Sequence, residues 1–199
     1  MQKPYDDVEA LLHLSPVSAM SLLDGVTIEG GTALHVAAAY GESDGFLSSA
    51  DIIRSKAKRL LFVQNKSGDT PLHCAAQAGM SRMVRHLITL AREENTGVNR
   101  AKELLEMENK LKETALHQAV RIGNNDIVKL LMEHSQLAIF SKDGTSPLYL
   151  AILLEEDIIV ETLFNASHKE LSYSRQNGQN VLHAAVLRGT GTQTSLHSS

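Results

Sequence analysis

The chain has 199 residues, of which 43% are apolar, and 19 Lys and Arg against 23 Asp and Glu leave a formal net charge of −4. This near balance argues against a polybasic protein that coats nucleic acid or an anionic membrane, so we expect no nucleic-acid partner. The single cysteine, Cys74, excludes an intrachain disulfide and a cysteine-rich zinc site, and we expect no cofactor.

Residues 1–25 are interpreted as an N-terminal cap or tail. The apolar stretch near the start is interrupted by His13 and Pro16, whereas a secretory signal needs a cationic start and an unbroken apolar run. Nowhere do ~18 apolar residues follow one another, the length that a membrane-spanning helix requires. We therefore expect a soluble, cytoplasmic chain that makes no membrane contact of its own.

Five related segments follow one another along the chain. The segment Thr-Pro-Leu-His-Cys-Ala-Ala that begins at Thr70 returns in four altered copies, and we call the first residue of each copy its anchor. The anchors are Thr32, Thr70, Thr114, Ser146 and Asn180, with spacings of 38, 44, 32 and 34 residues. Self-similarity at such a period indicates stacked helical units rather than one globular core.

Each copy has the pattern of a short inner helix that begins after its anchor. Thr, Ser and Asn carry side-chain oxygens that accept hydrogen bonds from the N–H groups of a first helical turn. Pro71 and Pro147 stand at the first helical position, where a missing N–H costs nothing. A leucine two residues past each anchor, and an alanine five past it, place a large side chain beside a small one on one face. The leucines are Leu34, Leu72, Leu116, Leu148 and Leu182.

Glycines mark the ends of the inner helices and the turns before them. A glycine nine residues past the anchor predicts a left-handed exit from the helix in four copies, at Gly41, Gly79, Gly123 and Gly189. The fourth copy has Glu155 instead, which predicts that its two helices join differently. Lys112 replaces the glycine that the other copies have two residues before the anchor. If that turn keeps a positive φ, the lysine costs ~1–2 kcal/mol.

A second, outer helix is indicated in three copies by a valine fourteen residues and a leucine seventeen residues past the anchor. The pairs are Val84 with Leu87, Val128 with Leu131, and Val160 with Leu163. The outer segment of the first copy, residues 46–62, has no clear register. In the second copy we expect a polar loop at residues 93–99 and a short helix at residues 100–105. The fifth copy lacks an outer helix, so we expect fraying from Ser174 onward.

The five copies resemble ankyrin repeats over residues 26–189, and residues 190–199 remain as a disordered tail. This resemblance implies an all-α solenoid of helix-turn-helix units with short turn or hairpin tips. Within the ankyrin repeats, the sequence at residues 146–151 and 177–186 resembles that of the plant ankyrin family typified by the accelerated-cell-death defence regulators.

Members of that plant family carry further repeats and then a membrane-spanning domain with a Pro-Gly-Gly start, and they are implicated in defence and cell-death signalling. This sequence contains no such domain, so the resemblance implies a truncated member or a fragment. A full-length form with that domain would lie at the cytosolic face of the plasma membrane.

Histidine recurs three residues past the anchor in four copies, at His35, His73, His117 and His183. No carboxylate accompanies these histidines at a fixed spacing, and Tyr149 replaces the histidine of the fourth copy. We therefore interpret them as structural residues that bond the backbone of an adjoining turn, rather than as metal ligands.

Other residues that could carry chemistry have simpler interpretations. Cys74 is interpreted as a small helix residue rather than a nucleophile. The basic run at residues 54–59 is interpreted as the solvated face of an outer helix, with a nuclear-import or anionic-lipid patch as the alternative. No phosphate-binding Gly-Lys-Ser loop, zinc-protease motif or nucleophile elbow occurs, so the sequence predicts no enzyme.

A stacked array offers a concave surface to a partner. By resemblance to ankyrin binders, its contact positions are the tips before each anchor and the two residues before each closing glycine. They are Lys66, Ser67, Asp69, Gln77 and Ala78; Lys110, Leu111, Glu113, Arg121 and Ile122; and Lys142, Asp143, Thr145, Leu153 and Leu154. For Ile122, Leu153 and Leu154, packing within the array is an alternative.

We hypothesise a non-catalytic scaffold that binds a protein partner of unknown identity through these positions. The alternatives are an adaptor that has lost a kinase or ubiquitin-ligase domain, and a soluble enzyme.

Overall fold

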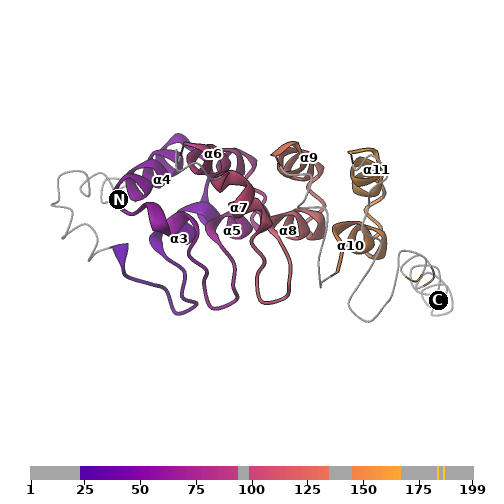
Figure 1. Ribbon diagram of the computed structural model, residues 1–199, viewed down its shortest axis with the longest axis horizontal. Coiled ribbons are helices and arrows are strands. Elements are labelled where there is room, and N and C mark those ends of the chain that lie inside the picture. Colours follow the sequence, from indigo (N-terminus) through magenta and orange to yellow (C-terminus); the bar gives the residue numbers. More distant parts are fainter. Residues whose placement is uncertain (1–22, 94–98, 135–144, 167–182, 184–185, 187–199) are drawn as a thin grey trace, which may run out of the picture.

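The computed structural model describes residues 23–93, 99–134 and 145–166, together with His183 and Val186. Every regular element in this part of the chain is a helix (Figure 1). Four inner helices are α3 (Ala33–Tyr40), α5 (Pro71–Gln77), α8 (Ala115–Arg121) and α10 (Pro147–Leu153). Four outer helices are α4 (Asp44–Lys56), α6 (Ser81–Arg92), α9 (Asn125–His134) and α11 (Asp157–Ala166). The 3-10 helix η2 (Lys58–Leu61) and helix α7 (Arg100–Glu106) are additions to this pattern.

The helices form two layers, and the turns that join successive repeats project from the inner layer (Figure 1). Neighbouring inner helices pack on one another, and each inner helix packs on the outer helix of its own repeat. The leucines two residues past the anchors, from Leu34 to Leu148, are buried between the layers, as are the alanines Ala37, Ala75, Ala119 and Ala151. The sequence therefore predicted the solenoid class and its repeating core correctly, because small and large side chains alternate at the same register in every unit.

The inner helices begin where the anchors predicted. Thr32, Thr70, Thr114 and Ser146 all precede a helix with extended backbone, at ψ between 148° and 172°. The hydroxyl of Ser146 accepts from the N–H of Tyr149 at 3.1 Å. Pro71 and Pro147 occupy the first helical turn, where no N–H is needed.

The exits from the inner helices correct two sequence predictions. Gly79 and Gly123 take the expected left-handed conformation, at φ 75° and 67°. Glu155 takes it as well, at φ 63°, and its N–H bonds the carbonyl of Ile152 as that of Gly79 bonds Ala76. The prediction that the fourth pair of helices joins differently is therefore wrong, because the hydrogen bonds of the joint impose the conformation on glutamate.

Gly41 also departs from the prediction, because its backbone is extended at φ −180° rather than left-handed. The ring of Phe46 lies where a Cβ on Gly41 would stand. The glycine is thus explained by the close approach of Phe46, which belongs to α4, and not by a left-handed turn.

Lys112 has φ 61°, so the turn before the third anchor keeps the left-handed conformation that glycine adopts at Gly30 and Gly68, at φ 74° and 82°. The predicted strain at this lysine is confirmed in its geometry. A non-glycine residue in this region costs roughly 1–2 kcal/mol.

Helices occur in both segments that interrupt the repeat period, and residues 94–98 of the expected polar loop in the second lie outside the described residues. Helix α4 and η2 occupy most of the first outer segment, for which the sequence offered no register. Helix α7 confirms the short helix expected at residues 100–105 and packs on α6 and α9. Arg100 of α7 places its guanidinium over the ring of Phe62, 3.8 Å from the ring centroid.

The basic run at residues 54–59 is not one solvated helix face. Helix α4 ends at Lys56 and Ala57 is buried. The side chain of Arg54 is 17% exposed and donates to the carbonyl of Leu90 at 3.0 Å, at the end of α6. The interpretation of this run is therefore corrected: one of its cations holds two outer helices together.

Candidate partner-binding groove

Three histidines link each inner helix to the turn of the next repeat. The Nδ1 atoms of His35, His73 and His117 accept from the backbone N–H of their own anchor at 3.1, 3.2 and 3.0 Å. Because Nδ1 is an acceptor, the proton lies on Nε2, which donates to a carbonyl in the following turn. These carbonyls belong to Asp69, Glu113 and Thr145, at 2.9, 3.0 and 2.6 Å.

These bonds have the geometry that the sequence predicted for structural histidines, and they leave neither ring nitrogen open to a metal. Burial lowers the pKa of His35, His73 and His117, while the carbonyl that each contacts raises it in part. In the fourth copy Tyr149 is buried at the same position. His183 is exposed, and Asn180 and Leu182 of the fifth copy lie outside the described residues.

The turn tips are the turns that precede the first three anchors, at residues 27–31, 65–69 and 109–113, and they border the concave surface of the array, which we call the groove. Asparagines shape the second and third of these tips. The Oδ1 atom of Asn65 accepts from the N–H groups of Ser67 and Asp69, both at 2.9 Å. Asn109 repeats this arrangement in the next tip, with Leu111 at 2.9 Å and Glu113 at 3.2 Å. Each tip is thus held by its own side chain five residues before the anchor, as is common for asparagine in turns.

Neighbouring tips are bonded directly to one another. The N–H of Lys66 donates to the carbonyl of Glu29 at 2.9 Å, and the N–H of Lys110 donates to the carbonyl of Ser67 at 3.0 Å. Gln64 reinforces the second junction, because its Nε2 contacts the carbonyl of Glu108 at 2.8 Å. The tips therefore form a continuous edge along the groove.

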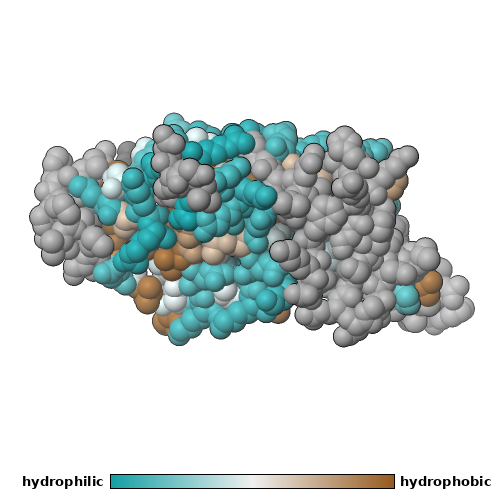
Figure 2. Space-filling view, in the orientation of Figure 1, coloured by the Kyte–Doolittle hydropathy of each residue, from teal (hydrophilic) through white to brown (hydrophobic). Residues whose placement is uncertain are grey.

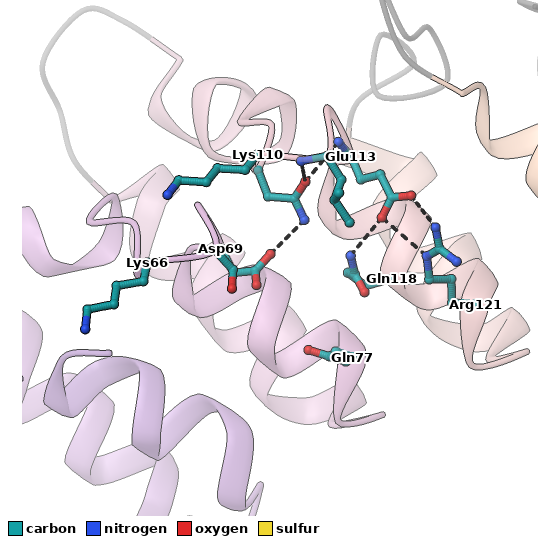
Figure 3. A pocket seen from close by; sticks show the side chains of 10 residues that line it. Lys66, Asp69, Gln77, Lys110, Glu113, Gln118 and Arg121 are labelled. Atoms are coloured by element: carbon teal, nitrogen blue, oxygen red, sulfur yellow. Dashed lines mark hydrogen bonds and ion pairs between the residues drawn. The ribbon is translucent and has the colours of Figure 1, made fainter. Parts of the chain in front are cut away.

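Between the second and third tips and the helices α5 and α8 lies a hollow of about 540 Å³ (Figure 3). Its lining residues are Lys66, Ser67, Asp69, Gln77, Asn109, Lys110, Leu111, Glu113, Gln118 and Arg121. All but Asn109 and Gln118 are among the partner-facing positions predicted above. The sequence analysis did not include Asn109 and Gln118, although their positions in the repeat could have indicated them. Asn109 stands five residues before its anchor, as Asn65 does, and Gln118 stands one helical turn before Ile122.

The carboxylates of the hollow are engaged within the protein. Glu113 has a side chain that is 5% exposed, and it pairs with the guanidinium of Arg121 and accepts from Gln118 Nε2 at 3.2 Å. Figure 3 shows both partners directed at Glu113. Asp69 accepts from Asn109 Nδ2 at 2.8 Å, which joins the second tip to the third.

The two lysines of the hollow have a different environment. Lys66 and Lys110 are exposed, and neither side chain pairs with any residue in the described ranges. In Figure 3 both extend away from the Glu113 and Arg121 pair. Leu111, beside Lys110 in the tip, is 70% exposed.

The remaining predicted positions lie outside this hollow. Ile122 and Leu154 at the ends of α8 and α10 are 41% and 39% exposed, and Leu153 is partly buried. Ala78 is exposed, and Thr145 contributes its carbonyl to His117. Lys142 and Asp143 lie outside the described residues. Part of each of these three side chains, Ile122, Leu153 and Leu154, is therefore packed within the array, and part is exposed to solvent.

The first repeat adds apolar surface that the sequence analysis did not include. Ile28 is 87% exposed, Tyr40 74% and Val36 40%. In Figure 2 hydrophobic surface reaches the edge of the molecule where the N-terminal turns project in Figure 1. Ile28 stands four residues before its anchor, as Lys66 and Lys110 do, so the repeat register is the signal that would have found it.

Cys74 has neither the exposure nor the charge environment of a reactive thiol. It is partly buried in α5, and burial raises the pKa of its thiol to about 11. A thiol with a raised pKa holds little thiolate at neutral pH. Among the described residues, no group of three His, Cys, Asp or Glu is placed to hold a metal ion. Within the same ranges, no helix combines the length and the apolar character needed to cross a bilayer.

A family model described as Ankyrin repeats (3 copies) matches residues 2–100 and, a second time, residues 90–172. The two matches together cover more than half of the chain. Comparison with curated protein sequences gave no match. Repeats of this kind generally mediate protein–protein interaction, and proteins built from them are typically non-catalytic scaffolds.

Proposed function

The chain belongs to the ankyrin-repeat family, and on this premise we propose that it is a non-catalytic scaffold that binds a protein partner in its concave groove. By groove we mean the surface between the turn tips and helices α3, α5, α8 and α10. The observation that carries the proposal is the hollow of about 540 Å³ at its centre. A repeat array can use such a surface because each unit is stabilised by its neighbours.

Several exposed side chains of the groove support this function because the fold does not use them. Lys66, Lys110 and Gln77 are exposed, and their side chains form no hydrogen bond or ion pair with a described residue. Leu111 and Tyr40 are largely exposed although they are apolar. Exposed apolar residues beside polar ones are typical of interaction surfaces.

The experiment is site-specific photo-crosslinking in the source tissue extract. A photoreactive phenylalanine analogue replaces Gln77 or Leu111 in the groove, and Lys129 or Arg85 on the outer helices serves as the control position. We expect both groove positions to crosslink the same protein and the outer positions to leave it uncrosslinked. Crosslinking of that protein from Lys129 and Arg85, with none from Gln77 and Leu111, would place the interaction on the opposite face.

The narrower resemblance to the plant accelerated-cell-death regulators supports a role in defence or cell-death signalling. Its only support is the amino-acid sequence of the fourth and fifth copies, at residues 146–151 and 177–186. The test is to express the chain in leaf tissue and measure cell death after an immune elicitor. A change in cell death that disappears in a groove variant, Lys66→Glu with Lys110→Glu, is expected. An unchanged response with the intact protein present would exclude this role.

A further inference from the structure

Three side chains stand at the same repeat position along the tip edge of the groove. Ile28, Lys66 and Lys110 each lie four residues before their anchor. The backbone bonds from Lys66 to Glu29 and from Lys110 to Ser67 hold the three tips in register. The edge therefore presents one apolar residue followed by two cations.

The spacing of this row follows from the bonds between the tips. Each tip turns back on itself, so equivalent residues of neighbouring tips are separated by two chain spacings of about 4.8 Å, or about 10 Å. The inner helices beneath them pack at a similar distance, about 8–10 Å. A peptide in the extended polyproline II conformation has three residues per turn and advances about 3.1 Å per residue, so every third side chain lies on the same face and meets the next tip.

Among the charged residues that line the hollow, only the two lysines have no partner within the described ranges. The carboxylate of Glu113 pairs with Arg121, and Asp69 accepts from Asn109, so both lining acids already have partners. Lys66 and Lys110 have no ion-pair partner within the described ranges, and Figure 3 shows them extending from the tips. Of the charged groups lining the hollow, the two lysines are the ones that remain for a ligand.

We propose that the groove binds an extended acidic segment of the partner protein. Two carboxylates three residues apart contact Lys66 and Lys110, and an apolar side chain three residues beyond them covers Ile28. This inference rests on the proposed function and specifies the chemistry of the bound segment. The lysines supply orientation and association rate, since exposed ion pairs add little affinity each, and the apolar contact at Ile28 supplies burial.

A nucleic acid is a weaker fit to this row than an acidic peptide. Its phosphates would also meet Glu29, an exposed acid whose backbone carbonyl accepts from the N–H of Lys66, and the chain as a whole carries a formal net charge of −4. A protein segment can place a neutral residue opposite this acid, because its side chains differ from one position to the next.

The test uses the full chain and fluorescent peptides of one composition. The matching probe contains Leu-Ser-Gly-Glu-Ser-Gly-Glu, measured also in reversed order, and the control isomer places the two glutamates side by side. Binding is followed by fluorescence polarisation at low salt, with a single-stranded oligothymidine as a polyanion control. Two variants are compared with the parent: Lys66→Glu with Lys110→Glu, and the neutral Lys66→Gln with Lys110→Gln. Lys129→Glu on α9 is the control for a charge reversal outside the groove, and thermal unfolding establishes that each variant is folded.

We expect the matching probe, in one of its two orders, to bind at least several-fold more tightly than the isomer. The charge-reversed variant should lose about tenfold or more in affinity, the neutral variant less, and Lys129→Glu nothing. Equal binding of both peptides, or loss of binding in Lys129→Glu, overturns the proposal. Tighter binding of oligothymidine than of the matching probe assigns the row to phosphate and overturns it as well.

The proposal of an acidic segment and the proposed groove function can fail independently of each other. If the groove position Gln77 still crosslinks the natural partner in the charge-reversed variant with undiminished yield, the groove function stands and the acidic segment is excluded. If Gln77 crosslinks nothing while the acidic peptide binds the parent, the failure lies with the proposed function in that extract.

Discussion

The carboxylate of Glu113, in the third turn tip, pairs with the guanidinium of Arg121, at the end of helix α8. The glutamate side chain is 5% exposed and the arginine side chain 43%. The same glutamate accepts from His73 through its backbone carbonyl, so it connects the second repeat with the third. Arg121, which the sequence assigns to partner contact, therefore also neutralises a buried charge of the array.

Replacement of Arg121 by alanine should destabilise the protein. The change leaves the Glu113 carboxylate buried with only Gln118 as a side-chain donor. Breaking a fully buried pair costs about 3–5 kcal/mol, and the exposure of Arg121 reduces this to about 1–2 kcal/mol. Urea unfolding measures the change.

Two further variants separate this effect from others. The exposed Lys129→Ala on α9 should remain within about 0.5 kcal/mol of the parent. Arg121→Ala combined with Glu113→Gln should regain stability over Arg121→Ala alone, because the buried charge is gone. If the single Arg121 variant unfolds at the same urea concentration as the parent, the pair contributes nothing to the fold. Alanine scanning of the groove should therefore use Lys66 and Lys110 before Arg121.

The stability of the array should fall as the pH drops below about 6.5. Burial lowers the pKa of His35, His73 and His117 from the usual value of 6.5, so the unfolded chain binds protons in a range where the folded chain does not. The stabilisation is complete above pH 6.5 and declines below it, toward the pKa of each folded histidine. Each such proton changes the free energy of unfolding by about 1.4 kcal/mol per pH unit.

Urea unfolding between pH 7.5 and pH 5.5 tests this, because most carboxylates stay ionised there. His73→Gln should be less stable than the parent at pH 7.5 but should show a shallower decline on acidification, since one titrating group is removed. A parent protein with constant stability across this interval would show that the histidines are not held neutral in the fold.

Replacement of Lys112 by glycine should stabilise the protein by about 1 kcal/mol. Lys112 has φ 61°, and glycine adopts this conformation without the contact between Cβ and the carbonyl oxygen. The ion pair that it forms with Glu108, at 3.9 Å, is exposed and contributes little. Thermal or urea unfolding of Lys112→Gly and Lys112→Ala provides the comparison, because alanine keeps the strain while it removes the same charge. A Lys112→Ala variant as stable as Lys112→Gly would contradict the strain at this turn.

Replacement of Gly68 by alanine should have the opposite effect. Gly68 has φ 82°, and a Cβ there would lie 2.7 Å from the backbone nitrogen of Lys110. The methyl group therefore adds a clash with the next tip to the conformational cost, and we expect a loss of roughly 2–3 kcal/mol. Hydrogen exchange should show faster exchange at the Lys110 amide, which bonds the carbonyl of Ser67 in the native array. As a control, Gly79→Ala has a similar φ, at 75°, but its Cβ would meet no atom closer than 3.6 Å, so it should cost less.

Local chemistry was sufficient to predict the anchors and the inner helices, and the resemblance to ankyrin binders supplied eight of the ten residues that line the hollow. Thr70 and Pro71 start a helix because of their own side chains, and the repeat register then places Lys66 and Gln77 on the same surface as Lys110 and Arg121. The sequence analysis missed the bond between Asn109 and Asp69 because it joins residues 40 positions apart. It also did not indicate that Glu113 is buried, since charged residues at turn tips are usually solvated.

By itself, the sequence determined the repeat and its all-helical class, because these depend on side-chain types that recur at a fixed register, whereas the positions proposed for partner contact came from the resemblance to ankyrin binders. The tertiary structure decided which of the side chains at those positions are bonded within the protein. Glu155 adopts the left-handed conformation of a glycine within the hydrogen bonds of its joint, whereas Gly41 is extended and its lack of a side chain leaves room for the ring of Phe46. In the same way, Arg121 is committed to Glu113 while Lys66 and Lys110 remain exposed, since only packing between repeats fixes which charges meet.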